Sequence, residues 1–323
     1  MEYLFYVSLI PLLISALITI IKPEKVSARH TLMMGIVIAL LLEVVSTLLH
    51  NAFNSSASLL ETHPLIIIEM VSFFLISLFT PAWSTKLETF VGISFLILIS
   101  FFMALNETVT ELYALLAISW CVFIVIIRKH SIVRRLCIIY GALISICFTL
   151  GTIYEMATLL GFMLLLGVFP FSAWFSHMFT HVSSGISASM LIIQCLAATK
   201  IAFFIPDVME NSHSILLCLA IVSSLMALFQ PIALRALAGL ATSQLSFIAF
   251  CFILPYEGLE EARIFITATF MLATPGLVLA VGALEARRGI LTLYRPGGNY
   301  DRYPRLANII LFFGLLSAGF PLS

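Results

Sequence analysis

Three ionisable side chains fall inside long apolar stretches of this sequence, namely Glu43, Glu69 and Lys200. A charged group inside a lipid bilayer is costly, so such residues mark proton or ion pathways or paired structural sites. Partly desolvated carboxyl and amino groups can exchange protons, and this is the chemistry that the three residues predict. The alternatives stay open: Glu43 as a protonated structural residue, Glu69 reaching the interface, and Lys200 extending its ammonium toward Asp207.

Other reactive residue types point to no further chemistry. His177 and His181 have the spacing of a two-histidine metal site on one helical face, but no carboxylate or thiol accompanies them, so we expect no metal. The six cysteines lie in apolar runs without a CxxC pair and are interpreted as packing residues. Nucleophile, nucleotide-binding and haem motifs are absent from the sequence. We expect no cofactor and a chain that is a non-catalytic subunit.

The composition predicts the elements that must position these residues. The chain has 323 residues, 62% hydrophobic and 10% charged, against about 25% charged in soluble domains, and its zero net charge gives no field for nucleic acid. Runs of about 20 apolar residues predict membrane-spanning helices. Such runs cover residues 3–21, 31–50, 65–82, 89–104, 112–127, 136–152, 156–175, 185–205, 214–230, 236–254, 264–284 and 306–323. The predicted fold is therefore an all-α polytopic membrane protein of about twelve transmembrane helices.

The distribution of basic residues predicts the orientation. Fourteen of the sixteen lysines and arginines fall in loops on one predicted side, Arg263 falls on the other, and Lys200 lies within a run. Lys and Arg accumulate in cytoplasmic loops, so this side is predicted to be cytoplasmic. We expect a multi-pass protein of the inner membrane with its N-terminus outside.

A faint internal repeat adds an architectural prediction. Residues 164–172 and 315–323 are identical at five of nine positions, and each copy carries a proline, Pro170 or Pro321, deep in a predicted span. Proline removes a helical hydrogen bond, so the repeat predicts two broken helices of the kind that line ion paths. A packing kink is the alternative for Pro170.

Residues 161–174, followed by 185–188 and 198–202, resemble the broken helix and its successor in the antiporter-like membrane subunits. This family includes proton-translocating subunits of respiratory complex I, Mrp antiporters, membrane-bound hydrogenases and the membrane subunit of the DAB inorganic-carbon uptake system. Further matches cover residues 230–235, 243–245, 282–285 and 304–305, so that the likeness extends over most of 89–323.

The resemblance implies N-terminal helices 1–3 in residues 1–88, a first inverted five-helix repeat in 89–205 and an incomplete second repeat in 214–323. It also implies proton transfer through buried Lys, Glu and His residues near the midplane. Matched position by position, however, three of the family's charged residues fall on Cys121, Leu165 and Thr274. The remaining proton-relay candidates are Lys200, Glu43, Glu69 and Gln244.

Two functions follow as hypotheses. The first is a subunit of a larger membrane complex that conducts protons or Na⁺, or couples them to the chemistry of a partner, as in complex I or DAB-type uptake. The second is a degenerate structural paralogue that anchors a catalytic partner. A self-contained transporter is disfavoured because the second repeat is incomplete. Arg295 and Arg302, in a predicted cytoplasmic loop rich in Arg and Tyr, are candidates for docking a membrane or cytosolic partner subunit.

Overall fold

The protein is described by a computed structural model that covers residues 7, 9–21, 25–53, 63–80, 87–105, 108–127, 130–151, 153–168, 170–204, 213–254, 258–294 and 302–318. These residues form thirteen helices. Among them no β-strand occurs, and an isolated bridge pairs Ile232 with Thr292. The predicted all-α class is therefore confirmed.

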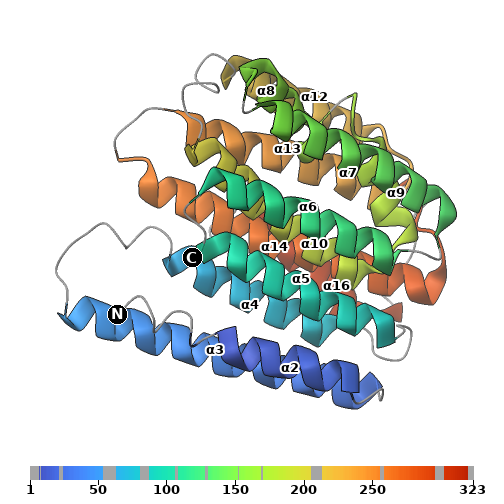
Figure 1. The fold of residues 1–323 in the computed structure, drawn as a ribbon. Helices are drawn as coiled ribbons and strands as arrows, with labels where there is room; N and C mark the ends of the chain where they lie inside the picture. The colour runs from blue at the N-terminus through green and yellow to red at the C-terminus, as the bar shows by residue number, and fades with distance from the viewer. Residues whose placement is uncertain are drawn as a thin grey trace.

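The first four described helices form one side of the bundle. Because a helix satisfies its backbone hydrogen bonds within the segment, apolar sequences adopt this structure in lipid. The helices α2 and α3 pack together along one edge, and α4 and α5 lie between them and the rest of the bundle (Figure 1). Their bounds are Leu9–Ile21 for α2, Lys25–Phe53 for α3, His63–Phe79 for α4 and Leu87–Leu105 for α5.

The middle of the chain contains an interrupted helix. The helix α8 ends at Leu166, where Gly167 adopts a left-handed backbone with φ of 62°, a conformation that favours glycine. A turn containing Pro170 follows, and α9 begins at Ala173. The single run expected at 156–175 is therefore two helices. The bounds are Val109–Ile126 for α6, Ser131–Gly151 for α7, Glu155–Leu166 for α8, Ala173–His181 for α9 and Ser184–Phe204 for α10.

The C-terminal helices complete the bundle. The helix α14 continues through an internal proline, Pro275, so proline alone does not break a helix here. Close packing joins α14 to α10, because a Cβ atom added at Gly282 would lie 2.6 Å from the Cβ of Ser184. The bounds are His213–Leu228 for α12, Ala233–Ile253 for α13, Glu260–Arg288 for α14 and Pro304–Ser317 for α16.

The centre of the bundle is α10. Of residues 184–202, all but Ser184 and Lys200 are buried, and the helix packs against α4 and α5 as well as α13 and α14. Figure 1 shows α10 and α14 between the layer of α4 and α5 and the layer of α13. Polar residues on α10 therefore lie between the N-terminal helices α4 and α5 and the C-terminal helices α13 and α14.

Six described helices are long and apolar enough to cross a membrane, namely α3, α6, α7, α10, α13 and α14. The other described helices, apart from α9, include shorter apolar segments of 10 to 17 residues. The chain is thus a multi-pass membrane protein in which six described helices are clear candidate spans.

The two ends of α13 and α14 are joined differently. At one end, Arg263 donates from Nε to the carbonyl of Cys251 (3.0 Å) and from Nη2 to that of Leu254 (2.5 Å). At the opposite end, the backbone N–H of Leu293 donates to the carbonyl of Pro231 (2.9 Å). Loops predicted to lie on opposite sides of the membrane therefore lie at opposite ends of these helices.

Candidate functional site

Four residues from four helices form what we term the charged cluster: Glu43, Glu69, Ser100 and Lys200. They belong to α3, α4, α5 and α10, and α4 packs against each of the other three helices. Both carboxyl side chains are fully buried, at 0% exposure. Lys200 is half-buried. The three ionisable residues that the sequence identified separately therefore lie on helices that pack against one another through α4.

Ser100 provides the polar contact to Glu69. Its hydroxyl donates to Oε1 of Glu69 and also lies 3.0 Å from the carbonyl oxygen of Ile97. The second carboxyl oxygen of Glu69, Oε2, is buried and has no hydrogen-bond partner among the described residues. Since a buried acceptor is rarely left unsatisfied, this oxygen is a place where a proton or an ordered water fits.

Electrostatic interactions connect the cluster. The charges of Glu43 and Lys200 both act on the carboxyl group of Glu69, with opposite signs. Glu43 and Lys200 each take part in a further interaction. The arrangement can hold a proton on a carboxyl group, with the ammonium of Lys200 compensating the negative charge.

A second polar group, which we term the neutral network, joins Gln244, Thr274 and Ser317 from α13, α14 and α16. Gln244 Oε1 accepts from the Thr274 hydroxyl (2.7 Å), and Gln244 Nε2 donates to the Ser317 hydroxyl (2.7 Å) and carbonyl (3.1 Å). None of the three residues is ionisable. Thr274, at the position where the resemblance places a Lys or Glu, thus completes an uncharged network.

Gln194 is a buried polar residue that the sequence analysis missed. It lies on α10 at 0% exposure, and both its Nε2 and its Oε1 are buried without a hydrogen-bond partner among the described residues. A buried amide in this state is typical of a site that holds ordered water. The available signal was an amide side chain within the apolar run of 185–205.

The remaining sequence-predicted residues are more dispersed. Pro170 is exposed in the turn between α8 and α9, and Arg302 is exposed just before α16. Pro321 and Arg295, as well as Asp207, lie outside the described residues.

The two histidines of α9 are neighbours, since the ring centroids of His177 and His181 lie 5.5 Å apart. The described residues contain no group of three or more His, Cys, Asp or Glu side chains that could hold a metal ion. Of the other two positions where the resemblance places charges, Cys121 is exposed and Leu165 is buried.

No protein-family model and no curated protein matches the sequence. Solved structures share its fold. A chain of the membrane-bound sulfane sulfur reductase, an archaeal respiratory membrane complex, matches with a TM-score of 0.79 and 15% identity, over 99% of this protein and 78% of that chain.

Two further structures show the same likeness. A chain of the Mrp complex from Dietzia sp. DQ12-45-1b matches with a TM-score of 0.75 and 14% identity, over 99% of this protein and 71% of that chain. A chain of respiratory complex I from Thermus thermophilus with bound aureothin matches with a TM-score of 0.75 and 17% identity, over 97% of this protein and 79% of that chain. The predicted resemblance is confirmed as a likeness of fold, since the chain is similar in fold to chains of these three membrane complexes.

Proposed function

We propose that this chain is a membrane subunit of a larger complex and that its charged cluster exchanges protons, which couples proton movement to the chemistry of a partner subunit. The observation that carries the proposal is that Glu43 and the half-buried Lys200 both act electrostatically on the fully buried Glu69. The fold shared with chains of respiratory and Mrp complexes supports membership of a multi-subunit membrane complex.

The charge count of the cluster favours a single exchangeable proton. Two carboxylates and one ammonium carry a net charge of −1, and burial of a net charge in a low-dielectric interior is strongly unfavourable. One proton on either carboxyl group makes the cluster neutral. Loss of this proton requires a compensating change, such as arrival of another cation, and this requirement is the physical basis of coupling.

The Ser100 hydroxyl can serve both protonation states of Glu69. When Glu69 is ionised, Ser100 donates to its Oε1. When Glu69 is protonated, the carboxyl group can donate to the Ser100 oxygen, and Ser100 then donates to the Ile97 carbonyl, 3.0 Å away. A partner that adapts in this way lowers the cost of moving the proton.

Gln194 and Gln244 extend the polar path away from the charged cluster. The unpartnered amide of Gln194 supports bound water on α10, which packs against α13, the helix that carries Gln244. Water bridges polar groups that do not touch. In this proposal Gln244 lies at the far end of the path, where water carries the proton, because a neutral amide side chain does not ionise at accessible pH.

The coupled reaction belongs to a partner, in a complex I-like assembly or in DAB-type inorganic-carbon uptake. We place the protein in the inner membrane with its N-terminus outside and about twelve spans. Arg295 and Arg302 would then face the cytoplasm and dock the partner. The guanidinium groups of Arg287 and Arg288 lie 5.6 Å and 5.9 Å from the ring centroid of Tyr303, so cation–π contacts join the two described ends of the loop that contains Arg295.

A structural anchor is the second candidate function. The observation that favours it is the apolar or neutral character of Cys121, Leu165 and Thr274, where the resemblance places charged residues. An anchor needs the fold and a docking surface, but not an exchangeable proton.

Proton flux in proteoliposomes separates the two functions. The complex, purified with the partners that accompany this chain, would be reconstituted with a pH-sensitive dye in the lumen. We expect Glu69→Gln to lower the flux at least about tenfold, because a positioned acid or base commonly contributes that much or more. Glu111→Gln is the matched control, since Glu111 is exposed in the first turn of α6. Equal flux in both variants, at equal protein abundance, would favour the structural anchor.

A further inference from the structure

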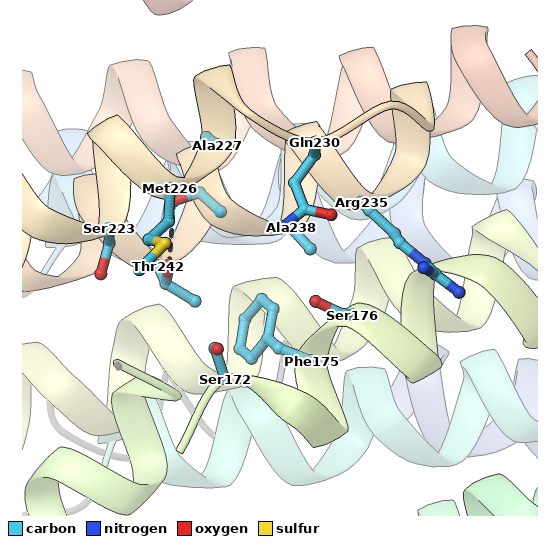
Figure 2. Close-up of a pocket in the computed structure, with 11 residues that line it drawn as sticks. Ser172, Phe175, Ser176, Ser223, Met226, Ala227, Gln230, Arg235, Ala238 and Thr242 are labelled. Atoms are coloured by element: carbon cyan, nitrogen blue, oxygen red, sulfur yellow. Dashed lines mark hydrogen bonds between the residues drawn. The ribbon is translucent and has the colours of Figure 1, made fainter. Parts of the chain in front are cut away.

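A small polar cavity lies between α9 and the helical pair α12 and α13, separate from the charged cluster and the neutral network. Its volume is about 40 Å³, and its polar lining consists of Ser172, Ser176, Ser223, Gln230, Arg235 and Thr242. In Figure 2, Ser172 and Ser176 lie on one side, facing the residues of α12 and α13, with Ser223 at one end and Arg235 at the other. We term this cavity the hydroxyl pocket.

Three of its hydroxyl groups are available to a ligand. Ser223 is 4% exposed, and its buried Oγ has no hydrogen-bond partner among the described residues. Ser172 occupies the N-cap position of α9 but makes no side-chain capping bond. Ser176, four residues later, shares its helical face. The fourth hydroxyl, on Thr242, donates to the carbonyl of Gly239 (2.9 Å).

The charged and partially charged groups around the hydroxyl pocket are positive. Among the described residues, Arg235 is the formally charged residue of its lining, and no Asp or Glu side chain lines it. The charge of Arg235 extends to His177 on α9. The N-terminus of α9, a helix of nine residues, begins directly after Ser172 and adds a partial positive charge.

These features favour an anion over water or a proton. A guanidinium group that stays charged at every accessible pH raises the energy of an excess proton and lowers that of an anion. Hydroxyl groups without an acceptor can donate to an anion. Since one water position needs about 10–15 Å³, the volume suits a few waters or one small ion. We propose that the hydroxyl pocket binds a small monovalent inorganic anion of the chloride or nitrate class.

The site lies toward the end of α13 that carries the Ile232–Thr292 bridge, since Arg235 belongs to the first turn of that helix. This is the end whose loops the distribution of basic residues predicts to be cytoplasmic. The anion would therefore enter from the cytoplasm. This inference does not depend on proton exchange at the charged cluster.

Binding of radiolabelled chloride to the detergent-solubilised full chain, purified with its partners, tests the proposal. We expect saturable binding that bromide and nitrate displace and that gluconate, too large for the pocket, does not. Arg235→Gln should weaken chloride binding at least about tenfold, because it removes the charge that compensates the anion. Arg135→Gln, which changes an exposed arginine of α7, is the control and should bind as the unmodified protein does.

A second pair of variants keeps the test valid if Arg235→Gln does not fold. Ser223→Ala should weaken chloride binding about threefold, the typical effect of one neutral hydrogen bond. Ser224→Ala is its matched control, because the neighbouring Ser224 hydroxyl donates to the Ile221 carbonyl (2.8 Å) and does not line the pocket. Absence of saturable binding, or equal affinity in the members of each pair, would show that the pocket holds water only and would overturn the proposal.

Discussion

The charged cluster and the neutral network solve the same physical problem, burial of polar groups between membrane helices, in different ways. In the neutral network, the Gln244 amide is satisfied by Thr274 and Ser317 at distances of 2.7 to 3.1 Å. In the charged cluster, Glu69 Oε2 has no partner among the described residues, and two carboxyl groups share one region with one ammonium. The first arrangement is satisfied as it stands, whereas the second requires a proton.

This difference indicates which of the two regions is expected to carry function. A satisfied network stabilises one packing arrangement and gives no energetic reason for a proton to enter or leave. A cluster with surplus negative charge is stabilised when it binds a proton. We therefore expect substitutions in the charged cluster to affect activity more than stability, and substitutions in the neutral network to do the reverse.

The largest effect is expected for Lys200. Lys200→Met removes the only ammonium of the charged cluster and should lower proton flux at least about tenfold in proteoliposomes. Lys200→Arg should also lower the flux, because guanidinium does not release its proton at accessible pH. If Lys200→Arg retains full flux, Lys200 provides charge alone. If both variants retain it, the charged cluster does not conduct, and the contrast with the neutral network disappears.

An intermediate effect is expected for Gln194, which lies on the helix between the two regions. Gln194→Leu should lower proton flux about threefold, since a water that bridges the path loses its hydrogen bonds. Thermal unfolding of the detergent-solubilised protein should be unchanged or should shift upward, because the variant removes a buried amide that lacks partners. A lower melting temperature with unchanged flux would show that Gln194 serves packing instead.

The smallest effect on flux is expected in the neutral network. Gln244→Leu leaves the Thr274 hydroxyl without its acceptor and should reduce the free energy of unfolding by about 1–3 kcal/mol. Proton flux should fall by no more than about twofold, because Gln244 does not ionise and water at this end of the path carries the proton. Thr274→Val is the companion variant and should destabilise similarly. A loss of flux as large as that of Lys200→Met would show that the Gln244 side chain is itself required for proton transfer and would end the distinction between the two regions.

Much of the fold was predictable from the sequence because apolar length is a local property. The twelve apolar runs overlap the helices, with the run at 156–175 divided into α8 and α9, and α3 beginning at Lys25, earlier than the predicted residue 31. The same local information identified Glu43, Glu69 and Lys200 as residues whose burial in lipid is unfavourable unless they are paired or functional. The resemblance to antiporter-like subunits rested on motifs in their order along the chain, so it could be recognised without knowledge of tertiary contacts.

The association of those residues could not be predicted in this way. Glu69, Ser100 and Lys200 are separated by 31 residues or more, and an apolar run fixes neither the rotation of its helix nor its neighbours. Those are set by close packing between helices, such as the approach of Phe313 to Gly276, where an added Cβ would lie 2.7 Å from the ring. Packing of this kind brings Ser100 to Glu69 and Gln244 to Thr274, and it places Ser176 of α9 in the lining of the cavity that Arg235 also lines. The sequence thus specified which side chains are costly in a membrane, and the arrangement of the helices determined which of them share a site.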